Sequence, residues 1–147
     1  MATTGATDEL HNHALIGRHF EEVWNQGRVE RVEAYYAADF HNFGQPTDPA
    51  HLRRIVNAWR QAFPDFRYAV ESIVAAGDEV FGHCTMTGTH RGPLPLSGWA
   101  AVAPTGLPVA VAHLHRFRVR DGQIAAHWAA RDDLGMLQQL GLVTPPA

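Results

Sequence analysis

Histidine dominates the chemistry that this sequence could perform. The chain contains ten histidines and one cysteine, Cys84, and all twelve of its basic residues are arginine. Without lysine the protein cannot form a Schiff base through a side-chain amine, and a single cysteine excludes intramolecular disulfides and CxxC redox motifs. We therefore expect histidine, aspartate, glutamate or tyrosine to carry any catalysis.

Three histidines fall on two segments that have the alternating pattern of β-strands. In residues 109–119, period-two alternation places His113 and His115 on one otherwise apolar face. In residues 123–130, His127 lies on the side that would adjoin this face if the two strands are neighbours. The pattern predicts a cavity with an imidazole wall. The alternative is a set of core histidines that are hydrogen-bonded to the neighbouring backbone.

The same histidines raise the question of a metal site. His113-x-His115 together with His127 offers three imidazoles, which is enough for catalytic zinc or iron. However, no acidic residue lies at a spacing that completes a facial triad, and the apolar neighbours offer no carboxylates to orient the ligands. The sequence therefore favours a site without metal.

Aromatic residues lie on or beside the apolar stripes of the predicted helices. Such residues pack in the core or line a pocket for a flat hydrophobic substrate, and the sequence alone does not separate the two outcomes. The candidate substrate-binding residues outside the two histidine strands are Trp24, Tyr36, His41, Trp59 and Phe63.

The elements that must position these residues follow from apolar periodicity and from turn residues. Apolar steps of three and four predict helices in the first half of the chain, and alternation predicts strands in the second half. The predicted helices are 8–24, 29–36, 48–63 and 132–140, with a brief extended piece at 40–43, and the predicted strands are 66–75, 80–89, 109–119 and 123–130. Helices followed by an antiparallel meander indicate an α+β fold with the helices on one face of a curved sheet.

Length and charge narrow the class of protein further. A chain of 147 residues is expected to form one domain, residues 1–147. The net charge is −3 and the arginines are scattered, so we expect no nucleic-acid partner. The chain lacks an apolar run long enough to span a membrane, and residues 1–8 lack the pattern of a signal peptide. These features predict no membrane association and a cytoplasmic location.

Several motifs occur in an order that resembles one known family. They are Phe63-Pro-Asp-Phe66, Val70-Glu-Ser-Ile-Val-Ala-Ala-Gly-Asp78, Thr87-Gly-Thr-His90, Ala103-Pro-Thr-Gly106, Phe117-Arg-Val-x-Asp-Gly-Gln-Ile124 with His127-Trp128, and Leu134-Gly-Met-Leu-Gln-Gln-Leu-Gly141. Together they resemble the SnoaL-like polyketide cyclases over about residues 10–142. The resemblance implies a cone-shaped α+β barrel that encloses a cavity, as in nuclear transport factor 2 and ketosteroid isomerase. It also implies cofactor-free ring closure of a hydrophobic, carbonyl-bearing substrate by an intramolecular aldol reaction, although relatives take part in hydroxylation, isomerisation or epoxide hydrolysis.

The sequence departs from this family at the position of its acid/base. The resemblance places the family histidine at His115, its polar partner at His113 and the catalytic aspartate at Ala129, which cannot exchange a proton. Asp132 is the nearby carboxylate that could replace the missing one. Three accounts stay open: acid/base catalysis by His115 and His127, ring closure directed by cavity shape alone, and a small-molecule carrier without catalysis.

Family members are commonly homo-oligomers that bury a face of the sheet. The face opposite the histidines carries Leu114, Trp128 and several alanines, which suits a homodimer.

Overall fold

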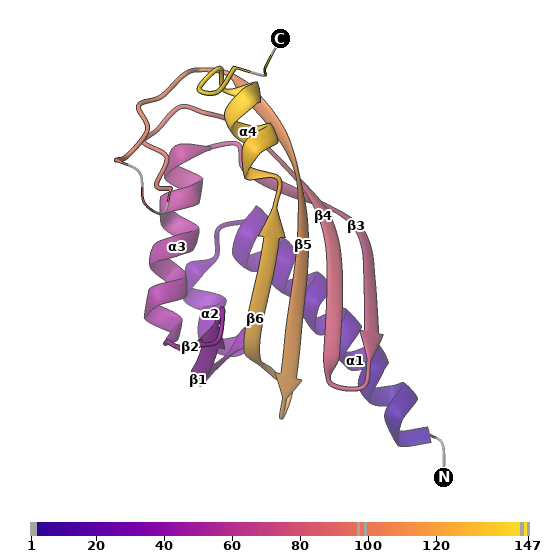
Figure 1. Cartoon of the computed structure of the whole chain (residues 1–147). Coiled ribbons are helices and arrows are strands. Elements are labelled where there is room, and N and C mark those ends of the chain that lie inside the picture. Colours follow the sequence, from indigo (N-terminus) through magenta and orange to yellow (C-terminus); the bar gives the residue numbers. More distant parts are fainter. Residues whose placement is uncertain (1–2, 97, 99, 145, 147) are drawn as a thin grey trace.

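The computed structural model describes residues 3–96, 98, 100–144 and 146, so both ends of the predicted single domain, residues 1–147, lie partly outside the described residues. Helices dominate the first half of the chain and long strands the second (Figure 1). The elements are α1 (Thr3–His19), the π-helix η1 (Phe20–Asn25), the 3-10 helix η2 (Val29–Arg31), α2 (Val32–Tyr35), β1 (Tyr36–Asn42), β2 (Gln45–Pro46), α3 (Pro49–Ala62), β3 (Arg67–Ala76), β4 (Glu79–Thr89), β5 (Pro108–Arg120), β6 (Gln123–Arg131) and α4 (Asp133–Gln139).

Six strands form one curved sheet in the order β2-β1-β6-β5-β4-β3. Strands β3 to β6 form the predicted antiparallel meander. At the other edge β1 runs parallel to β6, so the sheet is mixed and extends beyond the antiparallel meander that the sequence predicts. No hairpin joins β1 to β6, and turn geometry therefore does not fix their relative direction. Among the described residues the sheet stays open, with β2 and β3 at its edges.

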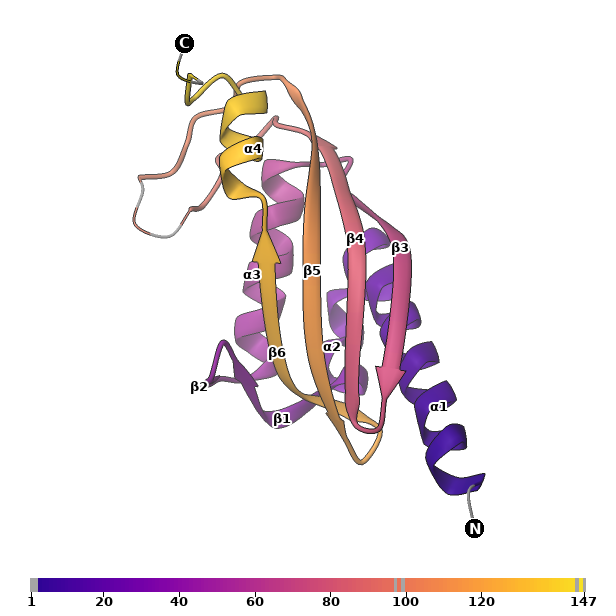
Figure 2. The same ribbon diagram turned by 45° about the vertical axis from the view of Figure 1, so that its right-hand side comes forward.

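Helices α1 and α3 cover one face of the sheet, and the other face of the long strands is left bare in the view of Figure 2. The core lies between these layers and is rich in aromatic residues, such as the fully buried Phe20, Phe63 and Phe117. The predicted α+β fold, with helices on one face of a curved sheet, is confirmed.

Local sequence signals explain where the main elements begin and turn. The Asp48 carboxylate accepts a hydrogen bond from the backbone N–H of His51 at 2.8 Å, and Pro49 is the first residue of α3, as the sequence predicts. The β5–β6 hairpin turns at Asp121 and Gly122, both of which have positive φ. This is the backbone that a two-residue hairpin requires.

The first predicted helix differs from the observed one in type. The sequence predicts one α-helix over residues 8–24, but the chain changes to a π-helix at Phe20. Backbone bonds then span five or six residues, as between Gln26 N–H and the Glu21 carbonyl at 2.9 Å. Hydrophobic periodicity does not distinguish an α-helix from one π-turn, and such turns often occur near functional sites. Here the π-helix buries Phe20, Val23 and Trp24.

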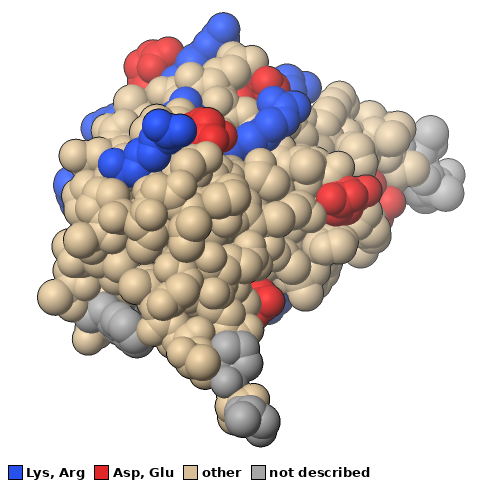
Figure 3. Space-filling model, turned by 90° about the horizontal axis from the view of Figure 1, so that it is seen from above, with Lys and Arg blue, Asp and Glu red and all other residues tan. Residues whose placement is uncertain are grey.

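Charged side chains of both signs are interspersed on the surface seen in Figure 3, and uncharged residues occupy most of that view. None of the helices in the described part of the chain combines the length and apolarity needed to cross a bilayer.

Candidate active site

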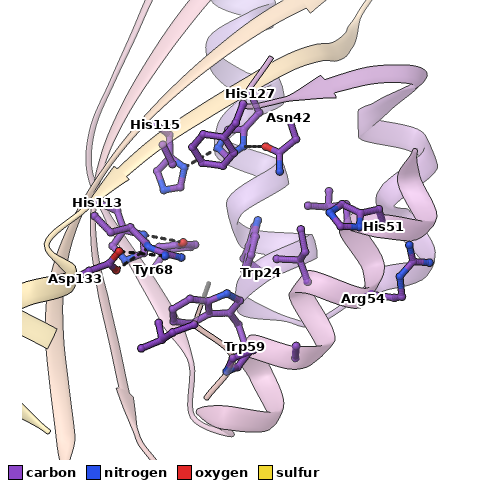
Figure 4. A pocket seen from close by; sticks show the side chains of 18 residues that line it. Trp24, Asn42, His51, Arg54, Trp59, Tyr68, His113, His115, His127 and Asp133 are labelled. Carbon is purple, nitrogen blue, oxygen red and sulfur yellow. Dashed lines mark hydrogen bonds and ion pairs between the residues drawn. The ribbon is translucent and has the colours of Figure 1, made fainter. Parts of the chain in front are cut away.

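A cavity of about 850 Å³ opens between the concave face of the sheet and helix α3 (Figure 4). Its volume lies within the range of roughly 300–1,000 Å³ that is usual for small-molecule sites. Histidines form one end, and tryptophans with aliphatic residues form much of the remaining wall. The lining residues are Trp24, Asn42, Phe43, His51, Leu52, Arg54, Ile55, Ala58, Trp59, Tyr68, Pro95, Leu96, His113, His115, His127, Ala129, Arg131 and Asp133.

The end of the π-helix fixes two aromatic residues of this wall. The Asn25 side chain bonds both backbone groups of Tyr68, accepting from its N–H at 2.7 Å and donating to its carbonyl at 3.0 Å. Arg60 of α3 donates to the Trp24 carbonyl at 2.7 Å. Of these bonds, the one from Arg60 satisfies a carbonyl that would lack a partner at the helix end. Together the bonds hold the Trp24 and Tyr68 rings in an edge-to-face contact with centroids 5.5 Å apart.

Strands β5 and β6 place the histidines as alternation predicts. His113 and His115 both point inward from β5 and are buried. In the register of the hairpin, Ala129 lies directly opposite His115, and His127 lies opposite Phe117. The rings of His115 and His127 are stacked with centroids 5.3 Å apart. The predicted imidazole wall is thus present in the cavity.

Hydrogen bonds tie these imidazoles into two groups. His115 Nδ1 lies 3.0 Å from His127 Nε2, and His127 Nδ1 lies 2.9 Å from Asn42 Oδ1. Separately, Tyr68 Oη lies 3.0 Å from His113 Nδ1. In both groups the partner is a side chain, so the alternative of histidines bonded to neighbouring backbone does not describe this cluster.

Burial keeps the histidines of the wall neutral. It lowers the pKa of His113 to about 3, with a smaller effect of the Arg131 charge, and it lowers the pKa of His127 to about 4. The pKa of His115 is also held well below its ordinary value by burial and then by the neighbouring imidazoles. Desolvation disfavours the charged form of a histidine. Each imidazole therefore has one N–H and one lone pair near pH 7.

Two nitrogens of the wall have no hydrogen-bond partner among the described residues. They are Nε2 of His113 and Nε2 of His115, and both atoms are buried. An unsatisfied buried polar atom costs about 1–3 kcal/mol and is uncommon in native proteins. Both atoms belong to adjacent inward positions of β5, and both residues line the cavity.

An ion pair lies at the cavity wall near α4. Arg131 Nε donates to Asp133 Oδ1 at 3.1 Å, and the Arg131 guanidinium stacks on the Trp59 ring at 4.8 Å from its centroid. Stacking of this kind restricts the indole. Trp59, which also lines the cavity, is therefore held in one orientation.

The structure brings six of the predicted site residues together. His113, His115, His127, Trp24, Trp59 and Ala129 all line the cavity. Asp132 does not. Its carboxylate caps helix α4 by accepting from the Gly135 N–H at 2.9 Å, and a Cβ at Gly135 would come within 2.2 Å of that carboxylate. The acidic residue of the lining is its neighbour Asp133.

Three further predicted residues also lie outside the lining. Tyr36 is buried in the core, where its hydroxyl bonds His19 Nε2 at 2.8 Å. Phe63 is fully buried behind Trp59, with their rings stacked at 6.0 Å. His41 is exposed on β1, and the next residue, Asn42, lines the cavity instead. An irregular register between Tyr36 and His41 makes the inward positions of β1 impossible to count from the sequence.

Several lining residues were not predicted from the sequence, chiefly Asn42, Tyr68, His51 and Arg131. Two of them had a usable signal, because Tyr68 lies on the inward side of an alternating strand and Arg131 continues the face of His127 and Ala129. Within the described residues, no group of three or more His, Cys, Asp or Glu side chains has the arrangement of a metal site.

Solved structures with the same architecture include enzymes named for polyketide chemistry. IdmH from Streptomyces antibioticus, a proposed polyketide cyclase, is 31% identical to this chain, with a TM-score of 0.74 and coverage of 88% of this chain and 98% of its own. AclR from Streptomyces galilaeus, a proposed hydroxylase, is 26% identical, with a TM-score of 0.77 and coverage of 95% and 86%. TsrD from Streptomyces laurentii is 20% identical and shares the fold, with a TM-score of 0.80 over 91% and 97% of the two chains.

No curated protein shows significant sequence similarity to this chain. A family model, by contrast, matches most of it. The model describes SnoaL-like polyketide cyclases and aligns with residues 14–140, which include every inward-facing histidine of the cavity. The chain therefore belongs to the SnoaL-like polyketide cyclase family.

Proposed function

We propose that this protein is a cofactor-independent cyclase that closes a ring in a flat, hydrophobic, carbonyl-bearing substrate by acid/base catalysis with histidine. The observation that carries the proposal is the pair of buried, unpartnered Nε2 atoms of His113 and His115 in the wall of an apolar cavity. The cavity volume of about 850 Å³ suits a polycyclic aromatic compound, and Trp24 and Trp59 contribute aromatic surface to its lining.

The hydrogen bonds give the two orphan nitrogens different roles. The Asn42 oxygen only accepts, so His127 Nδ1 holds a proton and the neutral His127 accepts at Nε2 from His115 Nδ1. His115 Nε2 then carries a lone pair and is the base. Tyr68 donating to His113 Nδ1 leaves one unsatisfied group, whereas the reverse orientation leaves two. His113 Nε2 accordingly carries a hydrogen and is the donor.

These roles support an intramolecular aldol reaction without any added group. The lone pair of His115 Nε2 takes a proton from the carbon next to a substrate carbonyl, and the C–H electrons form the enolate. His113 Nε2–H donates to the enolate oxygen. The enolate carbon then bonds to a second carbonyl carbon of the same molecule, whose π electrons move to oxygen, and that oxygen takes the proton from His115. Product and substrate are isomers, so no atoms or electrons are gained or lost.

The neutral state of the histidines fits this scheme. Burial keeps His113 and His115 neutral before the substrate binds, and a neutral imidazole is an effective hydrogen-bond donor to a developing oxyanion. Negative charge on the enolate then favours protonation of His115 at the moment when it must hold the proton. We infer that both rings expose their Nε2 atoms to the substrate when it enters the cavity.

The test is turnover of polycyclic aromatic ketones that carry an enolisable side chain, followed as a change of absorbance without a change of mass. Quenching of Trp24 and Trp59 fluorescence measures binding. We expect His115→Gln to lower turnover by about 10²- to 10⁴-fold while binding changes little. The exposed His83 provides the matched control, and His83→Gln should leave turnover unchanged. Unchanged turnover in His115→Gln would favour catalysis by cavity shape alone, and binding without product throughout would favour a carrier.

We also propose that two copies pair through the bare face of the sheet. Val74, Phe81 and Leu114 are exposed there, with Leu114 keeping 58% of its surface in solvent. Strand register brings Val74 and Phe81 side by side. A molar mass measured by light scattering separates a dimer from a monomer.

A further inference from the structure

The chain of hydrogen bonds behind His115 ends on a residue outside the histidine cluster. Asn42, the last residue of β1, accepts from His127 Nδ1 at 2.9 Å, and His127 in turn contacts His115 Nδ1 through Nε2 at 3.0 Å. The three side chains come from β1, β6 and β5, which are adjacent in the sheet. Figure 4 shows the two links as a continuous line along one end of the cavity.

We propose that Asn42 is a positioning residue which, acting through His127, determines which nitrogen of His115 carries the proton. This inference rests on the proposed role of His115 as the base. The proton positions follow one from another, because each hydrogen-bonded ring nitrogen of His115 and His127 has a single partner. If His127 Nδ1 keeps its hydrogen, then His127 Nε2 is an acceptor, His115 Nδ1 is a donor, and the lone pair of His115 stands at Nε2.

The backbone around Asn42 holds its amide in place. Asn42 pairs with His127 in the parallel β1–β6 register, and the N–H of Phe43 donates to the His127 carbonyl at 2.9 Å. The chain then turns sharply at Phe43 and Gly44, which both have positive φ, 52° and 77°. Successive positive φ values are typical of a tight hairpin turn, and a residue other than glycine adopts them at a cost in energy. The turn fixes Asn42 at the point where β1 stops.

Loss of the Asn42 oxygen would reverse the direction of the hydrogen bond between His127 and His115. A free imidazole in water prefers the tautomer with hydrogen on Nε2, and without Asn42 nothing opposes this preference at His127. His127 Nε2–H would then donate to His115 Nδ1, and the proton of His115 would move to Nε2. The base would become a hydrogen-bond donor, although no side chain that contacts the reacting carbon has changed.

The experiment compares Asn42→Leu with Asn42→Asp by ¹⁵N NMR of the histidine rings at pH 7.5 in the full-length protein. A ring nitrogen with a lone pair resonates far downfield of one that carries hydrogen, and the His115→Gln spectrum identifies the His115 signals. In the wild type and in Asn42→Asp, which keeps an acceptor oxygen, we expect the lone pair of His115 at Nε2. In Asn42→Leu we expect it at Nδ1, together with a fall in turnover of about 100-fold.

The outcomes separate this inference from the proposed function. An unchanged His115 tautomer in a folded Asn42→Leu protein overturns the inference, whatever happens to turnover. A reversed tautomer with unchanged turnover supports the inference and removes His115 as the base. Asn57 is exposed on α3 and does not line the cavity, so Asn57→Leu is the matched control and should alter neither the spectrum nor turnover. A tautomer change in that control would also overturn the inference.

Discussion

Two buried histidine–tyrosine pairs in this protein are closely similar in their chemistry. In one, Tyr36 Oη lies 2.8 Å from His19 Nε2, and in the other, Tyr68 Oη lies 3.0 Å from His113 Nδ1. In both pairs the second ring nitrogen of the histidine has no partner among the described residues. Burial lowers the pKa of both histidines to about 3.

The pairs differ in what surrounds them. The Tyr68–His113 pair lines the cavity, whereas neither His19 nor Tyr36 does. His19 instead packs among aromatic rings, with Phe20, Tyr36 and Phe117 within 5.5 Å of its centroid. A lowered pKa and an orphan nitrogen therefore report burial, and only a place in a cavity wall makes them evidence for a site.

The largest expected effect is the pH dependence of the free energy of unfolding, to which the two pairs should contribute equally. His19, His113 and His127 have folded pKa values of about 3, 3 and 4, while the unfolded value is about 6.5. Below pH 6.5 the unfolded chain takes up protons that the folded chain cannot. The free energy of unfolding should therefore be constant above pH 6.5 and fall as the pH drops towards 4. Each buried histidine contributes a loss of about 2 kcal/mol by pH 5.

Urea unfolding at pH 7.5, 6 and 5 measures this dependence. His19→Phe and His113→Phe should each reduce the slope by the equivalent of one proton, because burial rather than function lowers both pKa values. The exposed His83 gives the control, since His83→Gln should leave the slope unchanged. If only one of the two substitutions reduced the slope, the two pairs would not be equivalent in their effect on stability.

The next effect separates the pairs by function. Removing either tyrosine hydroxyl leaves a buried imidazole nitrogen without its partner, so Tyr36→Phe and Tyr68→Phe should each lower the free energy of unfolding by about 1–3 kcal/mol. Only Tyr68→Phe should also lower kcat/KM, by about tenfold, because His113 loses the bond that holds its ring in one orientation at the cavity wall. Equal losses of kcat/KM in the two variants would show that His113 has no special place in the reaction.

The smallest effect extends the comparison to the stacked aromatic residues Trp59 and Phe63, of which only Trp59 lines the cavity. Trp59→Leu should weaken binding of a flat aromatic ketone by about tenfold through loss of the stacking surface. Phe63→Leu should lower stability and leave the dissociation constant within about twofold. Fluorescence titration with Trp24 as the reporter measures both. Weaker binding in Phe63→Leu would mean that the lining extends deeper than the cavity described above.

Alternation along β5 was sufficient to place two histidines on one face. Because side chains of a strand alternate strictly between faces, His113 and His115 could be assigned to one side without knowing the fold, whereas His127 joins them through the β5–β6 register. The start of α3 could also be predicted, because Asp48 and Pro49 act within a single turn. Local rules of this kind need no distant partner.

Contacts between distant segments could not be predicted in this way. The sequence favoured His41 over Asn42, because the irregular pairing of β1 with β6 removes the count that fixes inward positions. The choice of Asp132 as a replacement carboxylate failed for a local reason instead, because that side chain caps α4 through the Gly135 N–H, as Asp48 caps α3. Tyr36 and Phe63 were as aromatic and as well patterned as Trp24 and Trp59, and only their packing excluded them from the cavity wall.

The sequence by itself determined the residue types available for chemistry and the α+β order of elements. It also determined the inward face of each histidine strand and the absence of a carboxylate at Ala129. The tertiary structure alone decided which polar atoms meet. Asn42 reaches His127 from β1, which lies far in the chain from the β5–β6 hairpin that carries His115 and His127, and Tyr68 reaches His113 from β3. Periodicity assigns a side chain to a face, but a hydrogen bond depends on register and distance between segments, which only the folded chain defines.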